Sequence, residues 1–329
     1  MPTPIRCDHK LFDKDLQGQV IIVTGANSGC GLETTRQLYK QGATVILACR
    51  NEQRAKNAVE DVSTSCPDSK GKLVYLHLDL SDLSSVRTFE KDFTSQYNRL
   101  DVLVNNAGIM ACPYGKTKDG FEMQFGCNHL AHFLLFQLMA PILIQTAEDT
   151  GKPSRFVSLS SCAASAMIGT GYATIDFDDL NSEEKKYDKG AAYQQSKLCN
   201  YLLAVEASKK FASSKLISAS VHPGWVLSNL DQHLVPTNFF GDLIRNLFRK
   251  LFQFSGDMIS AQDGAQSTLF CVLNDAENME SGGFYSQFGV YKDKEAKAGG
   301  WPLKLPNPNV ADDTASKLWE VSEKLVAES

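Results

Sequence analysis

The fold of this chain is indicated by the stretch QVIIVTGANSGCGLE, residues 19–33. It begins with β-branched residues, which are typical of a strand buried on both faces of a parallel sheet. Gly25, Gly29 and Gly31 follow, and then a helical pattern begins. Glycines allow a tight turn, and the free N–H groups at the start of a helix attract a pyrophosphate. The stretch therefore predicts a strand, a glycine loop and a helix that can bind a dinucleotide, although a plain turn would also use glycines.

The same alternation of strand and helix signals continues along the chain. Further apolar runs lie at residues 43–49, 72–78, 100–106, 154–161 and 216–224. Helical patterns lie at residues 31–40, 53–65, 84–97, 121–146, 192–212 and about 312–326. This alternation predicts βαβ units in an α/β fold, a doubly wound parallel sheet (Rossmann fold) of about seven strands with helices on both faces. The glycine loop follows the first strand of this series, which favours cofactor binding.

The composition narrows the class of protein. The chain has 329 residues and a net charge of −5, which argues against a nucleic-acid partner. No linker divides it, so we expect one domain over residues 19–329 behind an extension at residues 1–18. The nine scattered cysteines form no CxxC pair or Cys/His cluster, so no metal site is expected. Because we find no continuous apolar run of bilayer length and no signal or transit peptide, we expect a cytoplasmic protein.

The end of the second strand indicates which cofactor binds. A carboxylate there would bind the ribose 2′-OH of NAD, whereas a basic residue would accept the 2′-phosphate of NADP. The sequence reads ILACRNEQR, with no acidic residue at the strand end and Arg50 and Asn51 directly after it. A guanidinium matches a phosphate with two hydrogen bonds. We therefore predict NADP(H) rather than NAD(H), although Arg50 could also be a solvated turn residue.

Polar residues also follow the third and fourth strands. Asp79 and Leu80 come after the third, and NNAG, residues 105–108, ends the fourth. Ligands of open α/β sheets lie beyond the carboxyl ends of the strands. We therefore expect Asp79, Leu80, Asn106, Ala107 and Gly108 to contact the cofactor. The alternatives are helix capping by Asp79, Ser81 or Asp82 and a plain turn at NNAG.

The segment AAYQQSK, residues 191–197, places Tyr193 and Lys197 four residues apart in a predicted helix. Residues at this spacing share one face of a helix. An isolated pair of this kind is usually a surface feature. A cation beside a phenol, however, lowers the phenol pKa and brings it toward the range in which a general acid or base works.

Taken together, these motifs resemble the short-chain dehydrogenase/reductase family. The resemblance is carried, in the family's order, by TGANSGCG, Asp79, NNAG, Asn128 in CNHLAHF, VSLSS, YQQSK and HPGWVLSNL. Within the family, GFEMQFGCNHLAHFLL and ASKLWEVSEKL resemble the retinol dehydrogenase and WW-domain oxidoreductase branch. The protochlorophyllide reductases share parts of the pattern.

The resemblance implies roles for the catalytic residues. Tyr193 would be the general acid or base, and Lys197 would hold the nicotinamide ribose. Asn128 would hold a water that relays protons to Lys197. A serine after the fifth strand would orient the substrate oxygen, and spacing alone leaves Ser160 and Ser161 open. The family motif favours Ser161.

The remaining cofactor contacts are expected in two loops. In the glycine loop they are Gly25, Asn27, Ser28, Gly29, Cys30 and Gly31. After the sixth strand they are Pro223, Gly224, Val226 and Ser228, beside the nicotinamide. A bare Pro-Gly turn is the alternative at the second site.

An apolar helical pattern, NFFGDLIRNLFRKLFQF, covers residues 238–254. The family resemblance implies that the region 229–257 covers the substrate. The pattern would also fit ordinary core, a dimer face, or a helix resting on a membrane surface. A lipophilic substrate would arrive from a membrane, so the lid and the membrane contact are compatible.

These observations predict an NADP(H)-dependent oxidoreductase. It would transfer a hydride between the nicotinamide and a lipophilic carbonyl or alcohol that is retinoid-, steroid- or lipid-like. The resemblance implies a homodimer or homotetramer. The alternatives are an NADP(H)-binding scaffold or sensor without turnover and, more distantly, light-driven protochlorophyllide reduction.

Overall fold

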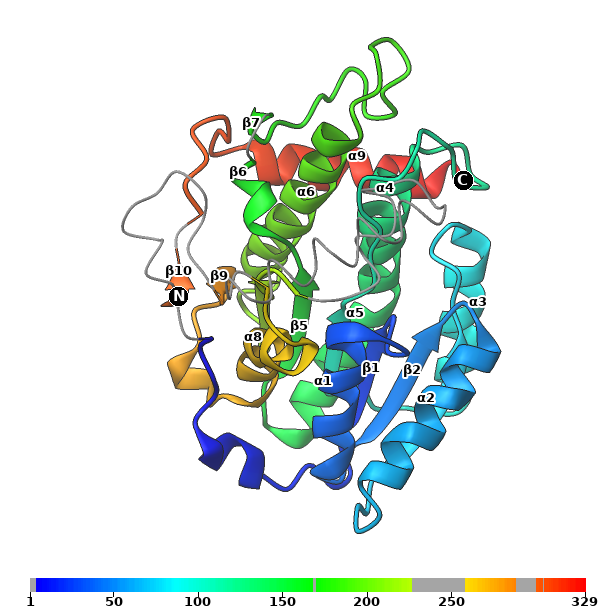
Figure 1. Cartoon of the computed structure of the whole chain (residues 1–329), viewed down its shortest axis with the longest axis vertical. Coiled ribbons are helices and arrows are strands. Elements are labelled where there is room, and N and C mark those ends of the chain that lie inside the picture. The colour runs from blue at the N-terminus through cyan, green and yellow to red at the C-terminus, as the bar shows by residue number, and fades with distance from the viewer. Residues whose placement is uncertain (1–3, 168–169, 227–257, 288–299, 304) are drawn as a thin grey trace.

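The computed structural model describes residues 4–167, 170–226, 258–287, 300–303 and 305–329. At its centre is a sheet with helices on both faces (Figure 1). Within the described residues the sheet has eight strands, in the order β10-β9-β8-β5-β4-β1-β2-β3. They are β1 Val20–Thr24, β2 Thr44–Cys49, β3 Lys72–His77, β4 Val102–Asn105, β5 Ser154–Leu159, β8 Leu216–His222, β9 Gly283–Ser286 and β10 Gly300–Leu303.

The predicted doubly wound parallel sheet is confirmed. All six apolar runs singled out in the sequence form strands, and these strands pair in parallel. Two more strands complete the sheet: β9 pairs with β8 in parallel, and β10 pairs with β9 antiparallel at the edge. A separate short hairpin joins β6 Ala166–Met167 to β7 Gly171–Tyr172. Parallel connections bring the carboxyl ends of β1, β4, β5 and β8 to one edge of the sheet.

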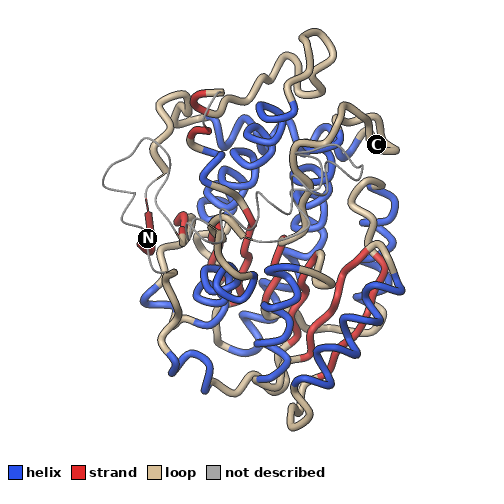
Figure 2. The backbone as a smooth tube through the Cα atoms, in the orientation of Figure 1, coloured by secondary structure: helices blue, strands red, loops and turns tan. Residues whose placement is uncertain are grey.

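The helices, blue in Figure 2, lie around the strands of the sheet, which are red. They largely follow the predicted stretches. They are α1 Gly29–Lys40, α2 Glu52–Ser65, α3 Leu83–Thr94, α4 Met123–Phe125, α5 Ala131–Thr150, α6 Lys189–Lys210, α8 Ala261–Leu273 and α9 Thr314–Ala327. The long helix predicted at 121–146 is divided, because a π-helical turn, Gly126–Leu130, separates α4 from α5. Helix α8 was not predicted, because several of its buried positions carry small or polar residues rather than an apolar stripe.

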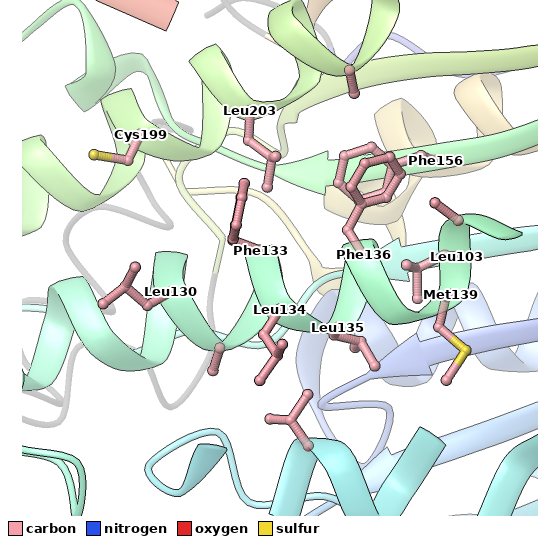
Figure 3. Close-up of a cluster of buried hydrophobic side chains, with 14 of the residues drawn as sticks. Leu103, Leu130, Phe133, Leu134, Leu135, Phe136, Met139, Phe156, Cys199 and Leu203 are labelled. Atoms are coloured by element: carbon pink, nitrogen blue, oxygen red, sulfur yellow. The ribbon is translucent and has the colours of Figure 1, made fainter. Parts of the chain in front are cut away.

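Two hydrophobic cores lie on opposite faces of the sheet. One packs α3, α5, α6 and α9 against one face, and the other packs α1, α2 and α8 against the opposite face. In the first core the ring of Phe136 on α5 lies 4.1 Å from that of Phe156 on β5, measured between centroids (Figure 3). Side chains alternate between the two faces of a strand, so neighbouring residues of β5 serve different cores.

One helix is longer and more apolar than inspection of the sequence indicated. The continuous helical stretch Met123–Thr150 has a mean hydropathy of 1.6 over its most apolar window, enough in length and composition to cross a membrane. The polar residues His129, His132 and Gln137 interrupt the apolar run, so it escaped inspection of the sequence. In the structure 67% of that window is buried inside the fold, as in the core helix of a globular domain.

The amino-terminal extension is held against α8. The backbone N–H of Cys7 donates to Gln266 Oε1 at 2.9 Å, and Arg6 forms an ion pair with Asp263 at 2.9 Å. The side chain of Gln287 makes two hydrogen bonds to the backbone of Ile5: its Oε1 accepts from the N–H, and its Nε2 donates to the carbonyl oxygen. Residues 4–18 therefore pack as part of the folded domain.

Candidate functional site

The glycine loop joins β1 to α1, and its glycines meet different steric demands. Gly25 and Gly29 have φ values of +63° and +55°, which favour glycine over residues with a side chain. At Gly31 a methyl group would collide with Nδ2 of Asn106 and lie 2.6 Å from the carbonyl oxygen of Gly25. At the start of α1 the backbone of Gly31 therefore packs directly against Asn106 and the Gly25 carbonyl.

The first turn of α1 offers unpaired backbone N–H groups beside this loop. Ser28 is the N-cap, and its hydroxyl makes no capping hydrogen bond. Cys30 is buried under α8, where a methyl group on Gly264 would lie 2.9 Å from its Sγ. Burial raises the pKa of the Cys30 thiol to about 12, so it packs as a neutral group. Cys30 can contribute its backbone N–H to a cofactor phosphate.

The end of β2 presents a cation to the same edge. Arg50 is exposed and forms no ion pair with any residue that the structure describes. Asn51 is the N-cap of α2, because its side chain accepts a hydrogen bond from the N–H of Arg54 at 2.9 Å. The guanidinium of Arg50 is therefore available for an anion, while the Asn51 carbonyl oxygen is used locally.

Asp79 follows β3 and shapes its own turn. Its Oδ1 accepts from the N–H of Ser81 at 2.9 Å and from the Ser81 hydroxyl at 2.7 Å. The N-cap of α3 is Asp82, whose side chain accepts from the N–H of Ser84. Helix capping is therefore assigned to Asp82, whereas Asp79 is placed at the carboxyl edge with Leu80 beside it.

The NNAG segment is anchored to the end of β1 by Thr24. The Thr24 hydroxyl oxygen accepts from the N–H groups of Asn106 and Ala107, both at 2.9 Å. Asn106 Nδ2 also donates to the Thr24 carbonyl oxygen at 2.7 Å. A methyl group on Gly108 would lie 3.3 Å from Nζ of Lys197 and 3.4 Å from Oδ1 of Asn128. This segment therefore joins the glycine loop to the predicted catalytic residues.

Helix α6 carries Tyr193 and Lys197 on the face that meets this edge. Asp188 begins the helix by accepting from the N–H groups of Gly190 and Ala191. Both Tyr193 and Lys197 are buried, and Nζ of Lys197 lies 5.8 Å from the centre of the Tyr193 ring. Nζ also donates to the carbonyl oxygen of Leu159 at 2.9 Å.

Burial shifts the pKa of both groups. It raises the pKa of the Tyr193 phenol, and a hydrogen bond with Ser161 opposes that rise. It lowers the pKa of the Lys197 ammonium to about 8. The phenol is therefore protonated at neutral pH, which is the form that can donate a proton. The predicted lowering of its pKa by Lys197 stays a prediction.

The two serines after β5 point in different directions. Ser160 donates its hydroxyl hydrogen to the backbone carbonyl of Lys197 at 2.7 Å, so it ties β5 to α6. Ser161 hydrogen-bonds Tyr193 and accepts from the N–H of Ala163 at 3.2 Å. Only Ser161 therefore has its hydroxyl beside the phenol, a difference that spacing could not reveal.

Asn128 lies in the π-helical turn, and its side chain hydrogen-bonds the backbone of Ile109, the residue directly after NNAG. Its Oδ1 accepts from the N–H of Ile109, and its Nδ2 donates to the Ile109 carbonyl, both at 2.9 Å. Nδ2 also donates to the hydroxyl of Ser196, which itself donates to the Tyr193 carbonyl. The structure thus brings Asn128, Ser161, Tyr193 and Lys197 to one edge of the sheet.

The turn after β8 lies against α8. Gly224 has a φ of +88°, and Val226 forms an isolated parallel bridge with Ile259. A methyl group on Gly264 would collide with Val226 and lie 3.3 Å from the Pro223 carbonyl oxygen. Ser228 and the region 229–257 are outside the described residues, so their predicted roles stay predictions.

Sequence reasoning missed three residues that hold these groups in place, namely Thr24, His132 and Ser196. Each is buried and makes hydrogen bonds to predicted site residues. Position gave a signal for Thr24, because it is the last residue of β1, and for Ser196, because it precedes Lys197. His132 stands four residues after Asn128, the spacing of one helical face.

The site has the features that a nicotinamide dinucleotide requires. A side chain at position 31 would collide with Asn106, the start of α1 can donate N–H groups, and Arg50 offers an exposed cation that forms no ion pair with any described residue. No group of three or more metal-ligating side chains occurs among the described residues.

Comparisons with known proteins agree with this geometry. The family model for short chain dehydrogenases matches residues 19–174. Retinol dehydrogenase 11 of Mus musculus is 40% identical over 271 residues, or 82% of this chain and 78% of the relative. Retinol dehydrogenase 12 of Homo sapiens is 37% identical over 311 residues, or 94% and 87%. The chain therefore belongs to the short-chain dehydrogenase family, in its retinol dehydrogenase branch.

Solved structures share the fold. A protein of Mycobacterium paratuberculosis has a TM-score of 0.71 at 31% identity, covering 99% of this chain and 98% of its own. NADPH-bound carbonyl reductase from chicken fatty liver has a TM-score of 0.58 at 22% identity, covering 87% and 100%. Because the chain belongs to the retinol dehydrogenase branch of a family that binds a nicotinamide cofactor, it is an oxidoreductase of alcohols or carbonyl compounds.

Proposed function

We propose that the protein is an NADP(H)-dependent oxidoreductase that interconverts a lipophilic carbonyl compound and its alcohol. The observation that carries this proposal is the meeting of Ser161, Tyr193, Lys197 and Asn128 beside the glycine loop. A scaffold that only binds a nucleotide has no use for a buried phenol and ammonium at this place.

In the proposed reaction the nicotinamide, when bound, supplies or takes up the hydride. Tyr193 donates its phenolic proton to the carbonyl oxygen as negative charge develops there, which is general acid catalysis. Ser161 donates a hydrogen bond to the same oxygen and orients it. In the reverse direction the phenolate is needed, and the positive charges of Lys197 and of the oxidised cofactor favour it.

Lys197 and Asn128 support Tyr193. The ammonium of Lys197 has two donors left after its bond to the Leu159 carbonyl, and these can hold ribose hydroxyls. Asn128 is proposed to hold a water that returns a proton toward Lys197. Its Oδ1 and Nζ of Lys197 both approach Gly108, which supports their cooperation.

The preference for NADP(H) is proposed from Arg50. An exposed guanidinium at the end of β2, with no neighbouring carboxylate at the strand end, suits a 2′-phosphate. The cofactor contacts proposed here are otherwise those expected from the two loops and from Asp79, Leu80, Asn106, Ala107 and Gly108.

The lipophilic substrate is proposed from the site's surroundings and its relatives. Among the described residues, the large apolar side chains that stay exposed are Tyr114, Tyr172 and Trp225. Tyr114 and Trp225 belong to the loops that follow β4 and β8, and Tyr172 belongs to β7, which comes after β5 in the chain. The similar proteins are named retinol dehydrogenases, which supports a retinoid-like substrate.

The test is NADPH oxidation by the purified protein with retinal, aliphatic aldehydes, steroid ketones and small ketones. Tyr193→Phe should lose about a hundredfold or more in kcat, because a general acid contributes at least that much. The variant should still bind NADPH. Tight NADPH binding by the wild-type protein without turnover of any carbonyl would instead favour a nucleotide-binding scaffold.

A further inference from the structure

Behind the cofactor loop, a fully buried histidine joins two parts of the site. His132 on α5 has 1% of its surface exposed. Its Nε2 lies 3.0 Å from the hydroxyl of Thr24, and its Nδ1 lies 3.0 Å from the carbonyl oxygen of Asn128. Neither the glycine loop nor the catalytic group includes this residue.

The neighbours of His132 determine which nitrogen carries its proton. The Thr24 oxygen already accepts two backbone N–H groups, from Asn106 and Ala107. A hydroxyl has two acceptor lone pairs and one hydrogen, so Thr24 must donate that hydrogen to Nε2 of His132. The carbonyl of Asn128 can only accept, so Nδ1 must carry the proton. Both contacts require the same neutral tautomer.

The electrostatic environment favours that neutral form. Burial lowers the pKa of His132 to about 4, the bond to the Asn128 carbonyl opposes the change, and the charge of Lys197 adds to it. A protonated imidazole would place a second N–H donor against the Thr24 hydroxyl, whose lone pairs are occupied. His132 is therefore an uncharged connector at neutral pH.

We propose that His132 is a positioning residue for the proposed reaction, because it holds the cofactor segment 106–108 and Asn128 in a fixed relation through one Nδ1–H tautomer. On one side it completes the hydrogen bonding of Thr24, which carries the segment. On the other it holds the main chain of Asn128, whose side chain clamps Ile109 and reaches Ser196. This inference rests on the proposed function.

The chain contains a matched control three residues earlier in the same helical segment. His129 is equally buried, and its pKa is lowered by burial to about 3. Its Nε2 lies 2.9 Å from the hydroxyl of Ser322 on α9, and its ring packs between Phe125 and Phe133. It therefore belongs to the hydrophobic core near α9 rather than to the cofactor segment.

The experiment compares His132→Phe with His129→Phe. Both remove a buried imidazole, so both should lower Tm. Only His132→Phe should also raise the NADPH Kd and lower kcat, each about tenfold, because hydrogen bonds that order the cofactor segment are lost. Kd by nucleotide fluorescence and kcat by NADPH oxidation separate this from a general loss of stability. Wild-type Kd and kcat in His132→Phe would overturn the inference.

Two measurements keep the inference testable if His132→Phe does not fold. In wild-type protein labelled with 15N-histidine, the His132 imidazole should be neutral with its proton on Nδ1; a proton on Nε2 would overturn the inference. Thr24→Ser, which keeps the hydroxyl, should bind NADPH more tightly than Thr24→Val, and equal affinities would count against the connection. Both readouts remain informative if no carbonyl is turned over, which would contradict the proposed function alone.

Discussion

The site contains two regions with different physical requirements. Around Gly31 there is no space for a side chain, whereas around Lys197 charged and polar side chains are buried away from water. At Gly31 a single methyl group would collide with Asn106 and crowd the carbonyl of Gly25. At Lys197 the ammonium is buried and relies on the Leu159 carbonyl for a hydrogen bond. In the proposed function the first region binds the cofactor through steric fit of the backbone, and the second tunes proton chemistry through desolvation.

This difference teaches which kind of change each region tolerates. The close packing of backbone around Gly31 is disrupted when any atom is added, because the close-packed neighbours have no room to move. A desolvated catalytic group fails when its hydrogen-bonding or charge state changes, even if its volume is kept. The predictions below separate these two modes of failure.

Gly31→Ala should have the largest effect. The added methyl group has no space beside Asn106 and the Gly25 carbonyl, so NADPH binding should be lost at concentrations that saturate the wild type. Overpacking of this kind should also lower the free energy of unfolding by about 2 kcal/mol. Nucleotide fluorescence and chemical denaturation measure the two effects.

Gly115→Ala is the matched control for this substitution. A methyl group there would meet only Cε of Met123, at 3.9 Å, which is an ordinary contact. Its NADPH affinity and stability should stay close to those of the wild type. If Gly31→Ala behaved like Gly115→Ala, the steric account of the glycine loop would be wrong.

Ser161→Ala and Ser160→Ala should separate chemistry from structure. Ser161→Ala removes a hydrogen-bond donor from the reacting oxygen, so kcat should fall about a hundredfold or more. Ser160→Ala removes a bond to the Lys197 carbonyl and should cost about 1 kcal/mol of stability with a much smaller loss of kcat. Steady-state kinetics and thermal melts of both variants provide the test. The reverse pattern would reassign the catalytic serine.

The pH dependence of Lys197 should separate activity from stability. Its pKa is lowered by burial to about 8, from 10.5, so the ammonium that the proposed reaction requires is lost as pH rises through about 8. Activity should therefore fall above that pH. Between about 8 and 10.5 the unfolded chain binds the proton that the folded chain has released, so this group's contribution to stability rises with pH.

Lys197→Met isolates that contribution. The variant lacks the titrating group, so the difference in unfolding free energy between it and the wild type should shift in favour of the wild type as pH rises across the same window. Denaturation curves at several pH values give this difference. A difference that stays constant with pH would mean that the Lys197 pKa is not lowered by burial.

Arg50→Gln should have the smallest effect on the molecule and a selective effect on the cofactor. Losing a charge-assisted hydrogen bond to the 2′-phosphate should weaken NADPH binding about tenfold or more. NADH binding and Tm should be unchanged, because Arg50 is exposed. Lys56→Gln removes a nearby charge from α2 and controls for general electrostatics; equal losses of NADPH affinity in both variants would exclude a specific role for Arg50.

Much of the fold could be predicted because its signals are local. The six apolar runs and the glycine spacing depend on neighbouring residues, and each run formed a strand. Helix α8 escaped because Gly264, Gln266 and Ser267 are buried by tertiary contacts rather than by an apolar stripe. The π-helical turn escaped because the sequence around Asn128 reads as one continuous helix.

The candidate site divides in the same way. Residue type and spacing were enough to single out Tyr193, Lys197 and the glycine loop, because a helical repeat and a turn are short-range features. Spacing could not choose between Ser160 and Ser161, since the choice depends on which side chain meets α6. Helical spacing could place His132 beside Asn128, but nothing in the sequence indicated that it also meets Thr24, which comes from β1.

The sequence by itself determined six strands of the sheet and most of the helices between them, the family, and the chemical types that could carry a hydride-transfer reaction. Only the tertiary structure decided which hydroxyl lies beside Tyr193, how far Lys197 is removed from water, and what holds the cofactor segment to Asn128. The physical reason is the distance along the chain over which each interaction acts. Backbone preferences and helical spacing act over a few residues, whereas desolvation and hydrogen bonding between elements exist only once distant parts of the chain have packed together.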